Sequence, residues 1–270
     1  MDRAVLRPAA PRVRVVLAAL AALGLVLPAP VQTQSAAAPR RLAIAAASDL
    51  QTALPELVAA FEKRASATVA VSFGSSGTLF AQIQNGAPFD VFFSADVEYP
   101  RQLVARHQAD EETLYEYARG RIVVWTRRDS GIDVSRGLDA LTDTRVTRIA
   151  IANPTLAPYG RAAVAALQQK GLYDQLQPKL VRGDNISQTA QLVESGNADV
   201  GILALSLALG SALRARGTYA EIPASLHPPI DQAAVVVTAS PNKALAREFL
   251  AFLRRPESKD LLMRLGFVHP

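Results

Sequence analysis

The segment TVAVSFGSSGTLFAQIQNGAPFDVFF (residues 68–93) contains a strand, a helix and a second strand in direct succession. β-Branched residues in 68–73 predict the first strand, the apolar spacing in 79–85 before Gly86 predicts the helix, and 89–93 predict the second strand. Repeated units of this kind form parallel sheets that helices cover on both faces. The segment therefore predicts an α/β fold.

The same alternation extends in both directions along the chain. Further strands are expected at 42–46, 121–126, 148–152, 180–181, 198–203 and 233–238, and further helices at 51–65, 97–106, 160–171, 186–195, 241–254 and 256–264. Two sets of about 110 residues each suit two lobes. We expect residues 39–119 plus 230–270 to form lobe 1 and residues 120–229 to form lobe 2.

Residues 1–38 have the pattern of a signal peptide. Four arginines and one aspartate in residues 2–14 precede the uncharged apolar run 15–27, and small residues follow up to Ala38. This order is typical of a secretory leader, and the apolar run is shorter than the roughly 20 residues of a membrane span. We expect cleavage between 29 and 38 and export to the periplasm; an uncleaved signal anchor is the alternative.

The leader also accounts for most of the positive charge. The chain has a formal net charge of +5, of which the leader's four arginines and one aspartate supply +3, so the mature part keeps +2. A nearly neutral body without a run of Lys or Arg argues against nucleic-acid binding. The chain has no cysteine, so we expect neither disulfides nor a lipid anchor, and a monomer stabilised by its packed core.

Four loops each follow a predicted strand and open a predicted helix. They are residues 45–50, 72–79, 153–160 and 183–187. Helix N-termini carry unpaired N–H groups and bind anions, and serine hydroxyls add donors without adding a cation. Such a cage suits a fully ionised dianion such as molybdate, whereas hydrogen phosphate also needs an acceptor. Taken singly, each loop is more simply an ordinary helix cap.

Four stretches give the chain a specific resemblance to a known family. They are AAAS (45–48), FGSSGTL (73–79), GAPFDVFFSAD (86–96) and LGF (265–267). These stretches resemble the periplasmic molybdate-binding proteins of ABC transporters, and the similarity runs over about 40–270. The resemblance implies a two-lobed type II periplasmic binding protein fold, with a mainly parallel sheet flanked by helices in each lobe. It also implies capture of molybdate, and equally of tungstate, between the lobes and delivery to an ABC permease in the membrane.

The resemblance further implies which residues bind the anion. Ser48 and Ser76 would hold it from lobe 1 through hydroxyl and main-chain N–H groups. Tyr159 and Ile186 would each give a main-chain N–H from lobe 2.

Two positions near this site depart from the expected pattern. Some family members have a tyrosine hydroxyl where this chain has Ala204; the hydroxyl of Tyr159 or Ser206 replaces it, or the site uses fewer donors. Asp49 is the second departure, because a carboxylate in the cage would repel a dianion. We expect its side chain to cap its own helix or to point away, with only its N–H available to the anion. A carboxyl that faced inward would instead favour a protonated anion such as hydrogen phosphate.

The alternatives are another tetrahedral oxyanion, sulfate or phosphate, and a hydrolase that uses Ser48 or Ser76. The hydrolase is disfavoured because the three histidines are isolated in the sequence and no nucleophile–base set is visible. We expect no enzyme activity, no metal site and no cofactor beyond the bound anion.

Overall fold

The computed structural model describes residues 40–270, which belong to one compact unit. The predicted signal peptide and its cleavage point lie outside the described residues. No helix within residues 40–270 combines the length and apolar character needed to cross a membrane.

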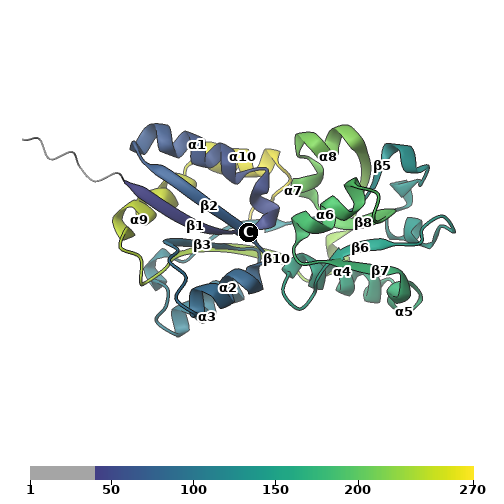
Figure 1. Ribbon diagram of the computed structural model, residues 1–270, viewed down its shortest axis with the longest axis horizontal. Helices are drawn as coiled ribbons and strands as arrows, with labels where there is room; N and C mark the ends of the chain where they lie inside the picture. Colours follow the sequence, from purple (N-terminus) through teal and green to yellow (C-terminus); the bar gives the residue numbers. More distant parts are fainter. Residues whose placement is uncertain (1–39) are drawn as a thin grey trace, which may run out of the picture. The chain divides into compact units, whose positions relative to one another are not determined.

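Two five-stranded sheets form the fold (Figure 1). The first has the order β2-β1-β3-β10-β4 and the second β7-β6-β8-β5-β9. The first contains β1 (Arg41–Ala47), β2 (Thr68–Gly74), β3 (Val91–Ser94), β4 (Tyr115–Gly120) and β10 (Ile230–Val236), and the second contains β5 (Ile122–Arg127), β6 (Ile149–Ala152), β7 (Leu180–Gly183), β8 (Val200–Ala204) and β9 (Gly217–Glu221). Only β10 in the first sheet and β5 in the second run against their neighbours. The predicted α/β fold with two mainly parallel sheets is confirmed.

Helices flank both sheets. Those of the first are α1 (Leu54–Ala65), α2 (Ser76–Gln84), α3 (Glu98–Ala105), α9 (Lys243–Leu253) and α10 (Pro256–Arg264), and those of the second are α4 (Pro158–Gln169), α5 (Tyr173–Leu176), α6 (Ile186–Glu194), α7 (Leu205–Ala208) and α8 (Ser211–Arg216). Short 3₁₀ helices include η1 (Ser48–Gln51), η3 (Arg128–Ser130) and η4 (Val134–Thr142). Side chains of α1, α9 and α10 pack with one face of the first sheet, and those of α2 and α3 with the other.

Alternate residues along β1 explain why both faces of the first sheet are buried. Ile44 and Ala46 belong to the apolar cluster that contains Phe61 and Phe249. The rings of these two phenylalanines pack edge to face, with their centroids 4.9 Å apart. Ala45 joins the cluster on the opposite face. An apolar residue at every position of a central strand is what a parallel sheet covered on both faces requires.

The chain passes from the first sheet to the second between Gly120 and Ile122, and returns between Glu221 and Ile230. Lobe 1 and lobe 2 below denote the parts that carry the first and the second sheet. The residue limits expected for the lobes stay a prediction.

Candidate anion-binding site

The four predicted loops meet in pairs where the two lobes touch. The Ser48 hydroxyl donates to Oδ1 of Asn185 at 3.2 Å, and the Ser187 N–H donates to Ser48 Oγ at 3.4 Å. The Gly77 N–H donates to the Leu156 carbonyl at 2.9 Å. The first loop therefore contacts the fourth, and the second contacts the third.

Ser48 and Ser76 are both buried in lobe 1, at 2% and 1% exposure. Ser76 is the first residue of α2, and its Oγ accepts the Ala95 N–H at 2.9 Å. No described residue takes the proton of the Ser76 hydroxyl, which can therefore donate to an anion. Ser48 begins η1, a 3₁₀ helix of four residues rather than the expected α-helix. It offers its hydroxyl and N–H without the dipole of a long helix.

Tyr159 and Ile186 lie in the first turns of two helices of lobe 2. Pro158 and Tyr159 open α4, and Ile186 opens α6. Main-chain N–H groups in the first turn of a helix have no acceptor within that helix. The Asn185 side chain accepts the N–H groups of Ser187 and Gln188, both at 3.0 Å, so the Ile186 N–H is left for another acceptor.

Asp49 is fully buried and binds the other lobe through its side chain. Its Oδ2 accepts the Tyr159 hydroxyl at 2.9 Å and Gln232 Nε2 at 2.7 Å. The Tyr117 hydroxyl donates to Gln232 Oε1 at 2.6 Å and completes the network. Of the two expected orientations of this side chain, the helix cap is wrong, since no side chain caps η1. The carboxyl points instead to a network shared by β4, β10 and α4.

Burial controls the protonation of this network. Loss of hydration raises the pKa of Asp49 from 3.8 to about 6, although the hydrogen bonds from Gln232 and Tyr159 act to lower it. Burial, followed by the nearby Asp49 charge, raises the pKa of the Tyr117 and Tyr159 hydroxyls well above the usual value. Both tyrosines are neutral donors at physiological pH.

The hydrogen bonds of Ser206 and Tyr159 bear on the alternatives for the missing tyrosine. Ala204 ends β8 and is fully buried. The Ser206 hydroxyl donates to the Asp49 carbonyl at 2.8 Å, and the Tyr159 hydroxyl donates to the Asp49 carboxyl. Both protons are engaged, so the geometry supports a site with fewer side-chain donors.

Two polar residues of this region did not stand out in the sequence. Asn185 both caps α6 and contacts Ser48, and its position directly before an expected helix was the available signal. Gln232 is fully buried within the apolar strand β10. A buried polar side chain needs hydrogen-bond partners, so a glutamine within an apolar strand indicates a polar contact at that position.

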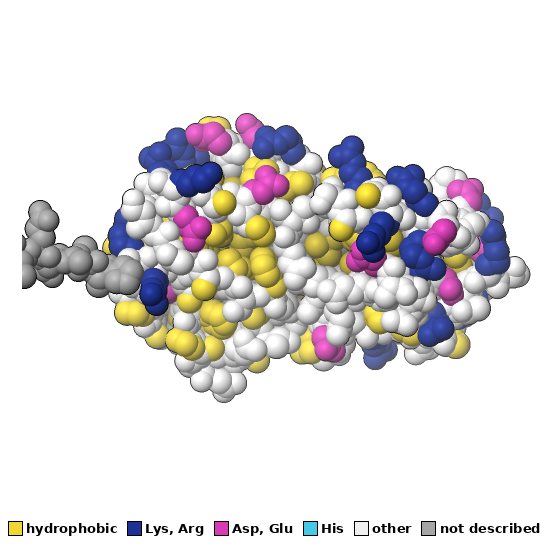
Figure 2. Space-filling model, turned by 45° about the horizontal axis from the view of Figure 1, so that its top comes forward, with side chains coloured by type: hydrophobic (Ala, Val, Ile, Leu, Met, Phe, Trp, Pro, Cys, Tyr) yellow, Lys and Arg dark blue, Asp and Glu magenta, His cyan; other side chains and the backbone are white. Residues whose placement is uncertain are grey.

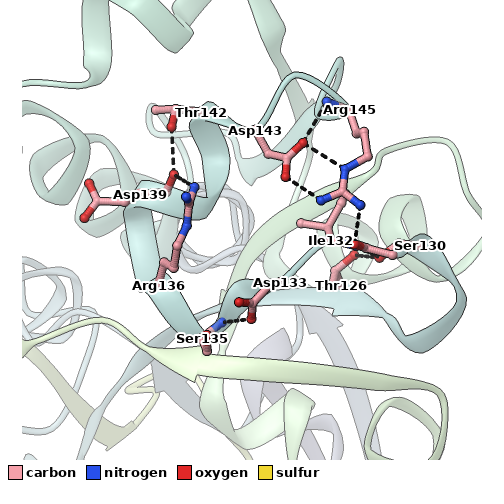
Figure 3. Close-up of polar contacts among 11 residues, drawn as sticks. Thr126, Ser130, Ile132, Asp133, Ser135, Arg136, Asp139, Thr142, Asp143 and Arg145 are labelled. Carbon is pink, nitrogen blue, oxygen red and sulfur yellow. Dashed lines mark hydrogen bonds and ion pairs between the residues drawn. The ribbon is translucent and has the colours of Figure 1, made fainter.

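The four loops contain two charged side chains, Asp49 and Asp184, and neither is a cation. Figure 2 shows Lys and Arg interspersed with Asp and Glu on the face that it displays. A separate polar cluster lies in the chain segment that connects β5 to β6 (Figure 3). Arg145 Nη2 and Asp143 Oδ2 are 2.6 Å apart there, and Arg145 also donates to the Gly131 carbonyl. Its Asp143–Arg145 ion pair is partly exposed and contributes little stability.

The chain is similar to known proteins along most of its described length. The family model described as bacterial extracellular solute-binding protein matches residues 42–268. The chain is 37% identical to the molybdate-binding protein ModA of Rhodobacter capsulatus over 246 residues, which cover 91% of this chain and 92% of that protein. It is 30% identical to ModA of Escherichia coli, covering 84% and 88%.

Solved structures show the same likeness. The periplasmic molybdate-binding protein of Azotobacter vinelandii superposes with a TM-score of 0.80 at 34% identity, covering 85% of this chain and 99% of that one. The sulfate-binding protein SubI of Mycobacterium tuberculosis superposes with a TM-score of 0.70 at 16% identity, covering 84% and 86%, which shows a shared fold alone.

Proposed function

The chain belongs to the bacterial extracellular solute-binding proteins, in the family of the ModA molybdate-binding proteins, and from this premise we propose that it captures molybdate between its two lobes. The family consists of binding proteins, not enzymes, which removes the hydrolase alternative. The observation that carries the proposal is the pairwise meeting of the four loops, with buried serine hydroxyls on one side and first-turn N–H groups on the other.

In this proposal Ser48 and Ser76 bind the oxyanion through hydroxyl and main-chain N–H groups, and Tyr159 and Ile186 bind it through main-chain N–H groups. The bonds of the Ser48 hydroxyl to lobe 2, at 3.2 and 3.4 Å, are long enough to be exchanged for shorter bonds to an anion oxygen. Hydrogen bonds to a charged acceptor contribute about 1.5–3 kcal/mol each.

Closure of the lobes around the anion would create the surface that a membrane permease recognises. The leader pattern in residues 1–38 supports export to the periplasm with cleavage of the leader. Tungstate would bind as molybdate does, because a cage of donors contacts only the oxygens.

Calorimetry of the mature protein with molybdate, tungstate, sulfate and phosphate tests the ligand. We expect binding heat with molybdate and tungstate and none with the other two anions. Tight sulfate binding without molybdate heat would overturn the proposal.

The Ser76→Ala variant tests the site. Loss of one charged hydrogen bond should weaken molybdate binding about 10- to 150-fold. The matched control is Ser195→Ala, at the exposed far end of α6, which should bind like the unmodified protein. Full affinity in Ser76→Ala would show that the site is assigned wrongly.

A further inference from the structure

The Tyr159 side chain crosses the lobe boundary and lies against Gly120. Because glycine has no side chain, this position leaves a slot for the Tyr159 hydroxyl. A Cβ atom at Gly120 would lie 2.2 Å from the Tyr159 hydroxyl and 2.9 Å from Gln232 Nε2. Real Cβ contacts are essentially never shorter than 3.0 Å, so only glycine at this position admits the hydroxyl. Inside the slot the hydroxyl donates to Asp49 and accepts from Gln232 at 3.0 Å.

This contact joins two residues that neighbour the anion-binding groups. Asp49 follows Ser48 directly in lobe 1, and Tyr159 carries one of the proposed main-chain donors of lobe 2. We propose that Asp49 and Tyr159 form a latch that closes with the Asp49 carboxyl neutral and holds the Tyr159 N–H against the bound oxyanion. The positioning of that N–H rests on the proposed function, whereas the latch between the lobes does not.

The surroundings of Asp49 favour its neutral form. The groups that face it are the Tyr117 hydroxyl from β4, the Tyr159 hydroxyl from α4, the Gln232 amide from β10 and the Ser206 hydroxyl from α7. None of these is a cation, and Asp49 Oδ1 has no hydrogen-bond partner among the described residues.

An ionised carboxylate buried without a cation is costly, and the charge would also repel the dianion. The raised pKa of Asp49 is the same effect expressed as proton affinity. When the latch closes, an Asp49 that was ionised in the open form takes up to one proton from the solvent.

The sign of the pH dependence follows from this proton uptake. The closed form binds protons more tightly than the open form, so closure is favoured as the pH falls through about 6 towards the ordinary aspartate range. Above about pH 6, protonation of Asp49 no longer favours closure. A bound dianion moves this pH range upward, because its charge favours the neutral acid.

Three matched variants separate the parts of the proposal. Asp49→Asn keeps an acceptor and removes the titration, Tyr159→Phe removes only the hydroxyl and keeps the N–H, and Tyr219→Phe changes an exposed tyrosine of β9 as a control. Molybdate affinity is measured between pH 5.5 and 8 for each. Proton uptake at pH 6.5 is measured by calorimetry in two buffers of different ionisation enthalpy.

We expect the affinity of the unmodified protein to rise as the pH falls, with a net uptake of protons. Asp49→Asn should show neither effect beyond the anion's own titration, and Tyr159→Phe should bind about tenfold more weakly, as for loss of one hydrogen bond. Parallel pH profiles for Asp49→Asn and the unmodified protein would overturn the neutral latch. Unchanged affinity in Tyr159→Phe would overturn the latch itself.

If molybdate gives no heat with the unmodified protein, the proposed function fails. The latch between Asp49 and Tyr159 can still be tested on the ligand-free protein. Urea unfolding of the ligand-free protein then compares Asp49→Asn with the unmodified protein at pH 5 and 8. A stability gain from Asn at pH 8 that shrinks at pH 5 supports a buried neutral Asp49, and an equal effect at both pH values refutes it.

Discussion

At Gly77, the absence of a side chain allows main-chain atoms of the two lobes to meet. Its N–H donates to the Leu156 carbonyl of lobe 2. A Cβ atom at this position would lie 2.8 Å from the Leu156 oxygen and 2.9 Å from the Tyr99 hydroxyl, which is too close for either. The hydroxyl belongs to a flexible side chain and can move, whereas the carbonyl belongs to the opposite lobe and moves only when the lobes separate.

Gly77→Ala should therefore impair closure without impairing folding. Alanine also favours the helix that begins here by up to about 1 kcal/mol, so we expect an unchanged or slightly raised thermal midpoint. Overpacking costs typically about 1–3 kcal/mol, which predicts a loss of molybdate affinity of roughly 5- to 150-fold in calorimetry. Affinity equal to that of the unmodified protein would show that the lobes do not approach this closely when the anion is bound.

At the level of elements, α6 illustrates how one cap serves both folding and the site. Asn185 accepts the N–H groups of Ser187 and Gln188 and the hydroxyls of Ser187 and Ser48. The first three bonds begin the helix, and the fourth joins it to lobe 1. Stability and anion binding can therefore be separated by choosing the replacement.

Asn185→Ala should lower the free energy of unfolding by about 1 kcal/mol, as loss of a helix cap does. Asn185→Asp caps equally well but places a negative charge beside the Ser48 hydroxyl. We expect it to retain stability in urea unfolding and to lose molybdate affinity in calorimetry at pH 7.5. A stable Asp variant with full affinity would mean that the start of α6 lies away from the anion.

The sequence predicted those elements whose pattern is local. The β-branched run at 68–73 and the helical spacing at 186–195 correspond to β2 and α6 with ends within one residue. β4 and β9 were not expected, because Tyr115–Gly120 and Gly217–Glu221 contain charged and small residues. They form strands because β4 pairs with β10 and β9 pairs with β5, and each partner lies far away in the sequence. Pairing of this kind leaves no local signal.

The candidate site was predictable to a similar degree. The serine-bearing loops were recognisable because each stands between a strand and a helix, and the structure brings Ser48 and Ser76 to the lobe boundary with Tyr159 and Ile186. The direction of the Asp49 side chain was not predictable. Its partner Gln232 lies 183 residues away on β10, and the two meet only once the first sheet has formed.

At the level of the whole molecule, contacts between the lobes differ in their exposure. Besides the buried latch, Arg161 of α4 pairs with Asp96 of lobe 1 and lies over the Tyr99 ring, 5.7 Å from its centroid. The side chains of this pair are 40% and 25% exposed. Water and salt screen charges at such a rim, so the pair guides the approach of the lobes more than it holds them together.

Arg161→Ala should consequently weaken molybdate binding by less than about fivefold, since an exposed ion pair contributes about 0–1 kcal/mol. The difference from the unmodified protein should shrink further in 0.5 M salt. Calorimetry at low and high salt checks both expectations. A loss greater than that of Tyr159→Phe would place the main lobe contact at the rim instead of at the latch.

The position of β10 in the first sheet has a consequence for the order of events during biosynthesis. This strand lies between β3 and β4, yet it is the last strand of the chain to be translated. All strands of the second sheet, residues 122–221, leave the ribosome earlier. The half of the protein that is synthesised first is thus the half that is completed last, and the nascent chain keeps an unfinished sheet next to its N-terminus until translation is almost over.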